Sequence, residues 1–524
     1  MDYWSKPMID REQMPLFAPT LGAAVAEDHP VRMFDEILGG VDWGQWEAQY
    51  PHQRGRPPIH PQVMAAAILY GLNRGIRSSR KLEDACMNRV DFIWLVEGRE
   101  IDHSTFADFR TRFGSQLKGL FRQVGRVAAR IGLIRLVALA TDGTRVKANN
   151  SRHRTATAAT LERDLAELDA QLAEALSQMA ANDHHDDDLF GQAGSDNRLP
   201  SDLATLGQRR EALSAALSTA KAADQARQKA KGKKAKPVQV PLTDQDAKVQ
   251  PNKEGGFAPN YTPMATTDSA KGFIVDEEVI NGAAEAATVI PMLDRVAGEF
   301  GQQPAQMFLD GAYGVGQNLA AFESCQIEAF TPIEHIEVCH NPAVRSAPNQ
   351  PVPADQWDAL PLSAGTKKLD RTAFIYDEQA DCYHCPMGER LTHEKTKNKT
   401  NACGTVAVRI YRCHECEGCA LAPKCMSESN RQGRTVQRDA YEPQRQRMIS
   451  RMNKDASKEL YKQRMWIGET PFAHIKEAMG IRQFLLRGLT KVQTEWRWAC
   501  TAFNMGKLVR ELTRLRSELA IAAT

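Results

Sequence analysis

Residues Leu136 to Lys147 read L-V-A-L-A-T-D-G-T-R-V-K, and this stretch decides the fold. A short apolar run rich in Val and Leu is typical of a buried strand, and this run stops at Asp142-Gly143, where a carboxylate precedes a residue suited to a tight turn. The stretch therefore predicts a core strand with an acid at its tip. Ligands and metals gather at such strand tips in open α/β sheets, although a lone Asp-Gly is also ordinary turn chemistry.

A second segment repeats this design further along the chain. Residues Met307 to Gly314 read M-F-L-D-G-A-Y-G, which again predicts a strand that ends in an acid followed by Gly. Strands and helices alternate in this region, which implies a partly parallel sheet whose neighbouring strand tips converge. Two carboxylates at adjacent tips are costly to hold as anions unless a cation lies between them. Asp142 and Asp310 are therefore a candidate magnesium site.

Length and charge set the general class of the protein. A chain of 524 residues predicts several structural units, and its formal net charge of +2 hides an acidic run at 183–188 and a basic run near 229–236. Charge therefore permits a nucleic-acid partner without establishing one. The longest apolar stretches fall short of the roughly 18 to 20 residues that span a bilayer, and no signal-peptide pattern opens the chain. We expect a cytoplasmic protein with no membrane partner.

Two further regions read as helical. Residues 1–130 predict an all-helical unit in which Arg80 and Arg110 are candidate DNA contacts, although helical bundles with surface Arg are common. Leucines at three- and four-residue steps from Leu161 to Leu176 predict an apolar seam, and a second helical stretch follows, so 158–236 should form an antiparallel hairpin. This hairpin is either self-contained, which we favour, or an arm for dimerisation or DNA binding.

Most of the eleven cysteines crowd into one region at metal-ligand spacing. Thiolates in C-x-x-C pairs suit tetrahedral zinc, and the alternative is a set of reduced, unliganded thiols. His384 and His414 add to the choice, so the region offers more ligands than one zinc ion requires. The cysteines concerned are Cys382, Cys385, Cys413, Cys416, Cys419 and Cys425.

A third carboxylate comes from the C-terminal region. Glu469, Phe472 and Lys476 step by three or four residues, so they share one side of a predicted helix, and Phe472 would turn Glu469 inward. Tyr461 and Arg464, together with Lys476, would border this acid with donors suited to phosphate oxygens.

Together these residues resemble the DDE transposases of bacterial insertion sequences. That resemblance implies an α/β fold: a ribonuclease H-like mixed-sheet core with an all-helical N-terminal domain, an inserted antiparallel helical hairpin and an inserted zinc-binding cysteine-rich module. The motifs that carry it are Gly55-Arg56-Pro57-Pro58, Ser79-Arg80-Lys81-Leu82-Glu83, Asp102-His103-Ser104-Thr105, Phe109-Arg110, Thr141-Asp142-Gly143-Thr144, Leu309-Asp310-Gly311-Ala312-Tyr313, and the set Tyr461, Arg464, Glu469, Phe472 and Lys476.

The resemblance also implies roles for single residues. It makes Asp142, Asp310 and Glu469 an acidic triad that holds Mg²⁺ or Mn²⁺. Glu469 lies one residue further from Arg464 than in the best-known form of the motif, and Ala258-Pro259-Asn260-Tyr261 replaces the more usual Gly-Tyr-Asn order before Asp268. The accompanying DNA-contacting residues are Tyr461, Arg464 and Lys476, and the implied ligands of a structural zinc ion are Cys385, Cys416, Cys419 and Cys425.

The domain boundaries follow from the motifs and their interruptions. We expect a helical DNA-binding domain at 1–130, the first part of the catalytic core at 131–157, the hairpin insertion at 158–236, more of the core at 237–335, the zinc insertion at 336–440, and helices that complete the core at 441–524.

The implied function is DNA transposition. Such an enzyme binds the terminal inverted repeats of its element, cleaves phosphodiester bonds and transfers the 3′-OH end into double-stranded target DNA, as a homodimer associated with the bacterial nucleoid. Phosphoryl transfer depends on positioning and charge neutralisation, which suits motifs made of acids, Arg and Lys. The alternatives are a catalytically inactive DNA-binding repressor derived from a transposase, and a nuclease without strand transfer.

Overall fold

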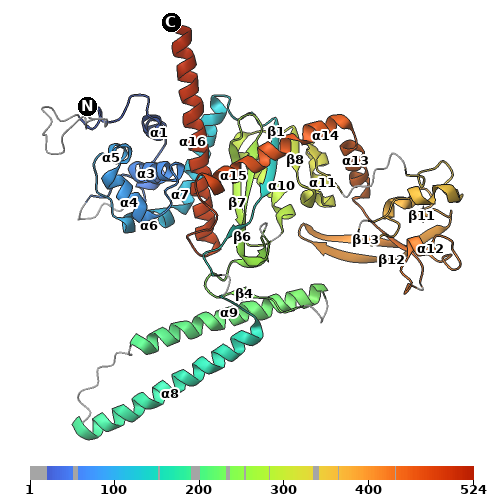
Figure 1. The fold of residues 1–524 in the computed structure, drawn as a ribbon, viewed down its shortest axis with the longest axis horizontal. Helices are drawn as coiled ribbons and strands as arrows, with labels where there is room; N and C mark the ends of the chain where they lie inside the picture. The colour runs from blue at the N-terminus through green and yellow to red at the C-terminus, as the bar shows by residue number, and fades with distance from the viewer. Residues whose placement is uncertain are drawn as a thin grey trace, which may run out of the picture. The chain divides into compact units, whose positions relative to one another are not determined.

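The computed structural model describes residues 20–50, 57–151, 154–190, 201–231, 236–252, 255–282, 284–333, 341–363, 365–430 and 432–523. The chain divides into two compact units (Figure 1). Unit 1 comprises Met1–Ile131, Val146–Asn149 and Ala473–Thr524, and unit 2 comprises Gly132–Arg145 and Asn150–Phe472.

Unit 1 is helical, as the sequence predicts for its N-terminal part. Local signals set its helix starts: Asp102 caps α6 by accepting a hydrogen bond from the Ser104 amide at 2.7 Å, and α3 begins at Pro61, whose fixed φ suits a first helical position. Its helices are α1 (Pro30–Gly39), α2 (Gly44–Glu47), α3 (Pro61–Asn73), α4 (Ser79–Asn88), α5 (Val90–Leu95), α6 (His103–Arg112), α7 (Gly114–Arg130) and α16 (Leu489–Ala523).

The C-terminal helix α16 belongs to this helical unit, where it packs beside α7 and α3 (Figure 1). Trp498 of α16 joins an aromatic cluster around Trp46, whose ring centroid lies 5.1 Å from that of Phe113. Asn73 donates to the carbonyl of Ala502 at 2.8 Å. Residues 441–524 therefore divide between the units, whereas the sequence analysis assigns all of them to the core. The reason is that α16 buries its aromatic face in the bundle.

Unit 2 is built on a mixed sheet in which β1 lies between an antiparallel and a parallel neighbour. The apolar run of β1 is buried because helices and strands surround it; Leu139 and Ala140 have no exposed surface. The strand order is β7-β6-β1-β8-β9, with β5 also paired to β6. The elements are β1 (Ala138–Gly143), β5 (Lys248–Pro251), β6 (Phe257–Asp268), β7 (Ile274–Ile280), η1 (Glu285–Thr288), α10 (Val289–Phe300), β8 (Gln306–Leu309), η2 (Gly311–Tyr313), α11 (Gly316–Ser324) and β9 (Glu328–Phe330).

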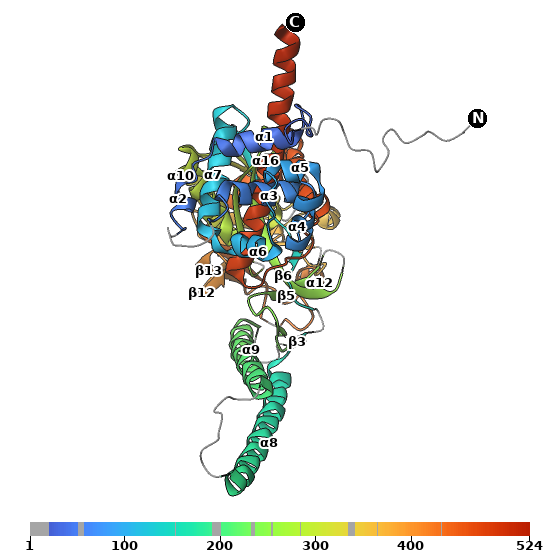
Figure 2. The same ribbon diagram turned by 90° about the vertical axis from the view of Figure 1, so that its left-hand side faces the viewer.

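Two long helices, α8 (Ala158–Phe190) and α9 (Ser201–Lys231), form the inserted segment (Figures 1 and 2). They run antiparallel, because Asp169 pairs with Arg210, whereas Glu162, earlier on α8, pairs with Lys221, which lies later on α9. The short strands β3 (Thr155–Ala156) and β4 (Val240–Pro241) pair at their base. Among the described residues, no helix combines the length and apolar character that crossing a membrane requires.

The leucine seam of the hairpin is buried only near its base. Leu161 is fully buried and Leu168 nearly so, whereas the side chain of Leu176 is 53% exposed. The side chains of the acidic run at 183–188, with His184 and His185, lie outside the described residues, as does most of the basic run at 229–236.

The cysteine-rich region folds as an antiparallel five-stranded sheet, and a series of helices follows it in the chain. Its elements are η4 (Ala354–Ala359), η5 (Arg371–Ala373), β10 (Ile375–Asp377), β11 (Cys382–His384), β12 (Arg390–Asn401), β13 (Gly404–Cys413), α12 (Ala422–Cys425) and β14 (Thr435–Asp439), followed by α13 (Glu442–Met452), α14 (Asp455–Tyr461), the π-helical segment η6 (Met465–Glu469) and α15 (Thr470–Glu477).

Gly388 tests how tightly this module is packed. Its φ is +86°, and a Cβ at this position would lie 2.4 Å from the carbonyl oxygen of Asn349. We expect Gly388→Ala to destabilise the module by about 1–3 kcal/mol, because strain and a backbone clash add. Gly418→Ala is the control, since Gly418 has a similar φ of +69° but no atom within 4 Å of the added Cβ. Thermal unfolding and limited proteolysis measure the difference, and equal losses in both variants would contradict the packing argument.

Candidate active site

The register of β1 and β8 brings two predicted acids together. The strands are parallel, and Thr141 pairs with Leu309. Asp142 and Asp310 follow these paired residues directly, so they lie side by side where the β1–β8 pairing ends, with Asp142 still paired to Ala265 of β6. The expected convergence of neighbouring strand tips is therefore present.

Asp142 is held in a largely buried position. Its side chain is 17% exposed, and its Oδ1 accepts a hydrogen bond from the Gly143 amide at 2.8 Å. The pKa of Asp142 is raised to about 6, chiefly by burial and to a lesser extent by the nearby Asp310 and Glu285, although the Gly143 hydrogen bond and Arg464 act in the opposite direction. A carboxyl group in this setting gains stability as an anion only when positive charge lies beside it.

The glycines that follow both acids are required by close packing. A Cβ on Gly143 would lie 2.5 Å from the Met264 sulfur and 2.9 Å from Oε2 of Glu285. A Cβ on Gly311 would lie 2.8 Å from the carbonyl oxygen of Pro332. The repeated Asp-Gly pairs therefore keep the strand tips free of side-chain bulk, in addition to the turn chemistry that the sequence suggests.

The third acid is positioned by a local change of helix type. Residues Met465–Glu469 form a π-helix, whose hydrogen bonds span one residue more than those of an α-helix. Arg464 and Glu469, five residues apart, therefore lie on the same face, with Arg464 Nη1 3.4 Å from Glu469 Oε1. The π-helix absorbs the extra residue that separates this motif from its best-known form.

Arg464 lies among all three predicted acids. Its Nη2 is 3.9 Å from Asp142 Oδ2 and 3.4 Å from Asp310 Oδ2. Because these two oxygens share one neighbouring nitrogen, they lie within about 8 Å of each other, a span that two metals about 4 Å apart can bridge. Three carboxylates around one guanidinium form a donor set that fits a hard divalent cation.

A fourth acid, which the sequence analysis missed, lies behind Asp142. Glu285 Oε1 accepts a hydrogen bond from Arg145 at 2.6 Å, and its Oε2 accepts one from the Tyr313 hydroxyl at 3.1 Å. Arg145 also donates to the Thr262 hydroxyl at 2.7 Å. Glu285 stands in an Ala-rich segment with no motif around it, so only the folded chain reveals its position.

The other expected DNA contacts occupy different settings. The Tyr461 hydroxyl donates to the carbonyl of Leu309 at 3.0 Å, and burial raises the pKa of Tyr461 to about 12. Arg80 is exposed on α4. Arg110 is half-buried, and its Nη1 donates to the carbonyl of Arg77. Lys476 lies on α15, beyond the boundary of unit 2.

The block before Asp268 also has an internal role. The Tyr261 hydroxyl donates to Asp244 at 2.7 Å, and the Asn260 amide donates to Asn252 at 2.8 Å. Asn260 and Tyr261 are both completely buried. These two residues fasten β6 to the segments beside it.

Five cysteines converge on one small cavity of the cysteine-rich module, one more than the expected set. Cys413 joins the four predicted ligands because the end of β13 carries it beside Cys385, whose pKa is lowered to about 7 chiefly by a hydrogen bond from Cys413. This thiol-rich donor set fits zinc. The cysteines among the residues that line the cavity are Cys385, Cys413, Cys416, Cys419 and Cys425.

Two segments of the chain match known protein families. Residues 384–509 match the family model described as Transposase DDE domain, and residues 19–112 match Transposase domain (DUF772). Among curated proteins, none matches the chain. The first match includes Glu469 and the cysteine cavity, and the second covers most of the N-terminal helices. Asp142 and Asp310 lie outside both matches, so their place in the site rests on the β1–β8 register.

Arg464→Gln tests whether the three carboxylates form a cation site. Without the guanidinium, repulsion among the acids should lower the unfolding temperature in the absence of metal, and Mg²⁺ should bind about tenfold tighter, which is about 1.4 kcal/mol. Titration with Mg²⁺ during thermal unfolding measures the effect. Arg447→Gln, which removes a surface ion pair with Glu323, is the control. The cation-site assignment fails if Mg²⁺ stabilises the two variants equally.

Proposed function

The two family matches support an insertion-sequence DDE transposase, and on that premise we propose that the chain cleaves phosphodiester bonds at the ends of its element and joins the freed 3′-OH to target DNA. The observation that carries the proposal is the arrangement of Asp142, Asp310 and Glu469 around Arg464. The core that holds them is proposed to be ribonuclease H-like.

Asp142, Asp310 and Glu469 would hold the divalent metal ions, Mg²⁺ or Mn²⁺. Bound there, the metal supplies Lewis-acid stabilisation of the phosphoryl oxygens and lowers the pKa of the attacking hydroxyl. Each acid comes from a different element, so the sheet edge and the π-helix together set their spacing. A site of this kind works by positioning and by neutralising charge, without a covalent nucleophile.

The neighbouring residues would orient the acids and the DNA. Arg464 is a guanidinium within reach of the three carboxylates, so a DNA phosphate entering the site would meet a bidentate donor. Tyr461 ties its helix to the residue before Asp310 and so holds the strand tip. Glu285, fixed by Arg145 and Tyr313, would keep the chain behind Asp142 rigid.

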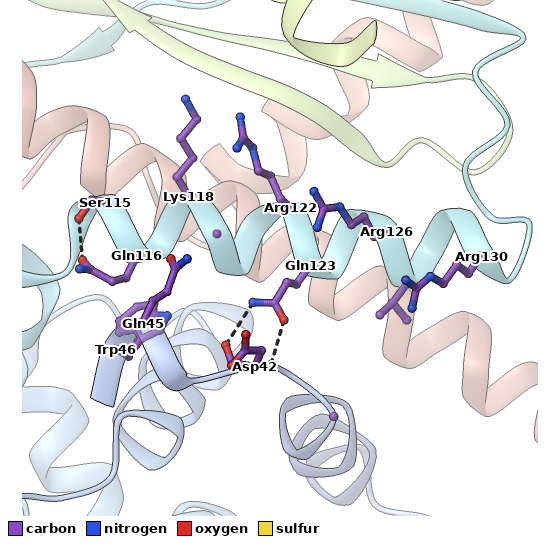
Figure 3. A pocket seen from close by; sticks show the side chains of 13 residues that line it. Asp42, Gln45, Trp46, Ser115, Gln116, Lys118, Arg122, Gln123, Arg126 and Arg130 are labelled. Atoms are coloured by element: carbon purple, nitrogen blue, oxygen red, sulfur yellow. Dashed lines mark hydrogen bonds between the residues drawn. The ribbon is translucent and has the colours of Figure 1, made fainter. Parts of the chain in front are cut away.

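A row of cations on α7 would contact the DNA backbone. Lys118, Arg122, Arg126 and Arg130 follow at four-residue steps, so they lie along one side of the helix (Figure 3). They line a cavity of about 490 Å³ in unit 1, and Gln123 on the same helix is hydrogen-bonded to Asp42. Cations at this spacing suit successive phosphates, which fix the position of a duplex without reading its sequence.

The structural zinc ion would be held by Cys385, Cys416, Cys419 and Cys425, with Cys413 beside them.

Two element ends must be brought together before joining, so we propose that the active form is a homodimer on double-stranded DNA.

The central test replaces the acids one at a time. Asp142→Asn, Asp310→Asn and Glu469→Gln should each lower Mg²⁺-dependent cleavage of an element-end duplex by about 10³-fold or more, with binding of that duplex retained. Glu459→Gln, which removes a surface ion pair with Lys462 at an exposed acid on α14, is the control. Full cleavage by any acid variant would contradict the assignment.

The same assay separates the alternative functions. End binding by the unaltered chain without nicking, in Mg²⁺ and in Mn²⁺, would favour the repressor, and nicking without a joined product would favour the nuclease. Inverted repeats, if found in the DNA that flanks the gene, would supply the substrate.

The α7 row is tested by salt dependence. Lys118→Ala with Arg130→Ala should weaken binding to all duplex sequences alike and reduce the slope of log K against log salt concentration by about 2, because two phosphate contacts are lost. Arg516→Ala, which removes a surface ion pair with Glu36 in the same unit, is the control. An unchanged slope in the double variant would rule out this surface.

A further inference from the structure

The hairpin of β10 and β11 carries two sets of metal-binding side chains on opposite faces. Successive residues of a strand point to opposite sides, so Cys382 and His384 share one face, while Tyr383 and the following Cys385 take the other. Tyr383 belongs to the hydrophobic cluster that also packs against Cys385 and the remaining cysteines of the cavity. Cys382 and His384 are thereby directed away from the five-cysteine cavity.

Three ligand-type side chains converge on this second face. Asp377 pairs directly with Cys382 in the antiparallel register. The His384 Nε2 atom lies 3.8 Å from the Cys382 sulfur and 3.9 Å from Asp377 Oδ2. Ligand atoms about 2.0–2.3 Å from a tetrahedral zinc ion are roughly 3.3–3.6 Å apart, so only a small inward movement of these side chains separates them from zinc coordination.

The hydrogen bond of the second ring nitrogen of His384 also suits a metal-binding histidine. Its Nδ1 lies 3.3 Å from the carbonyl oxygen of Gly388. A carbonyl only accepts hydrogen bonds, so this contact places the ring proton on Nδ1 and leaves the lone pair of Nε2 facing Cys382 and Asp377. Metal-binding histidines characteristically donate their other ring nitrogen to a backbone carbonyl in this way.

The simpler alternative is a buried histidine that accepts a weak hydrogen bond from a thiol. That alternative accounts for Cys382 and His384, each 3% exposed. Asp377 holds the turn through Oδ1, which accepts hydrogen bonds from the amides of Gln379 and Ala380 at 3.0 Å. The alternative does not explain why the Oδ2 atom of the same carboxylate faces His384, in a trio whose ligand atoms all lie within 4.8 Å of one another. A donor set of sulfur, nitrogen and oxygen is typical of zinc.

We propose that Asp377, Cys382 and His384 bind a zinc ion of their own, separate from the five-cysteine cavity, with water as the fourth ligand. Binding converts the Cys382 thiol to a thiolate and releases one proton to solvent. The ion joins β10 to β11 beside the turn that connects them. This site does not depend on the proposed transposition activity.

Zinc content of the full-length protein tests the proposal. The unaltered chain should hold one zinc ion more than the Cys382→Ser and His384→Gln variants, measured by elemental analysis and native mass spectrometry. Cys416→Ser should affect only the other site and keep the zinc bound by the trio. His393→Gln and Cys325→Ser, a histidine in the same sheet and an exposed cysteine outside it, should leave the zinc content unchanged.

Asp377→Asn is a variant that should still fold, because its side chain is 37% exposed and the substitution keeps its size. It therefore separates loss of zinc binding from misfolding. Its circular dichroism should be unchanged, while a chelator should remove one zinc ion at least about tenfold faster than from the unaltered chain. Cobalt titration gives an independent reading, since a cobalt–thiolate absorption band should be weaker in Cys382→Ser. Equal zinc content, chelator kinetics and cobalt absorption in the unaltered chain and in these variants would overturn the proposal.

Discussion

The parallel pairing of β1 with β8 is the constraint on which the candidate site depends. It sets Thr141 opposite Leu309, so the acids that follow these two residues must lie at neighbouring points where the pairing ends. Two carboxylates so close together repel each other, and burial adds to the cost for Asp142. A cation between them offsets both the repulsion and the cost of burial, and the guanidinium of Arg464 provides such a cation. The same electrostatic demand makes this edge of the sheet suited to divalent metal.

The π-helix at Met465–Glu469 shows how the fold preserves a site when the spacing of a motif changes. One additional residue in an α-helix would rotate Glu469 by about 100° away from Arg464. Widening a single turn to five-residue hydrogen bonding restores the alignment, at the cost of less favourable backbone geometry. Arg464 remains within 3.4 Å of Glu469 as a result. Such local distortions are frequent at functional sites, where side-chain position matters more than helix regularity.

The cysteine-rich module uses strand alternation in a comparable way. A one-residue step from His384 to Cys385 moves a ligand from one face of β11 to the other, so adjacent residues can serve different sites. In the sequence, the six cysteines with His384 and His414 form one pool of possible ligands, because spacing alone does not show which face of a strand a side chain occupies. Pairing of β11 with β10 places Cys382 and His384 beside Asp377, whereas five other cysteines line the cavity and His414 is exposed.

The sequence by itself determined the features that depend on neighbouring residues. The apolar run before Asp142, its repeat before Asp310, the leucine steps of the hairpin and the clustered cysteines all follow from local periodicity and spacing. Tertiary structure alone decided the place of α16 in the helical unit, the position of Glu285 near Asp142, the contact between Arg110 and the carbonyl of Arg77, and the burial of only the inner part of the leucine seam. These features arise from contacts between segments distant in the chain, and no local pattern encodes which distant surface a residue will meet.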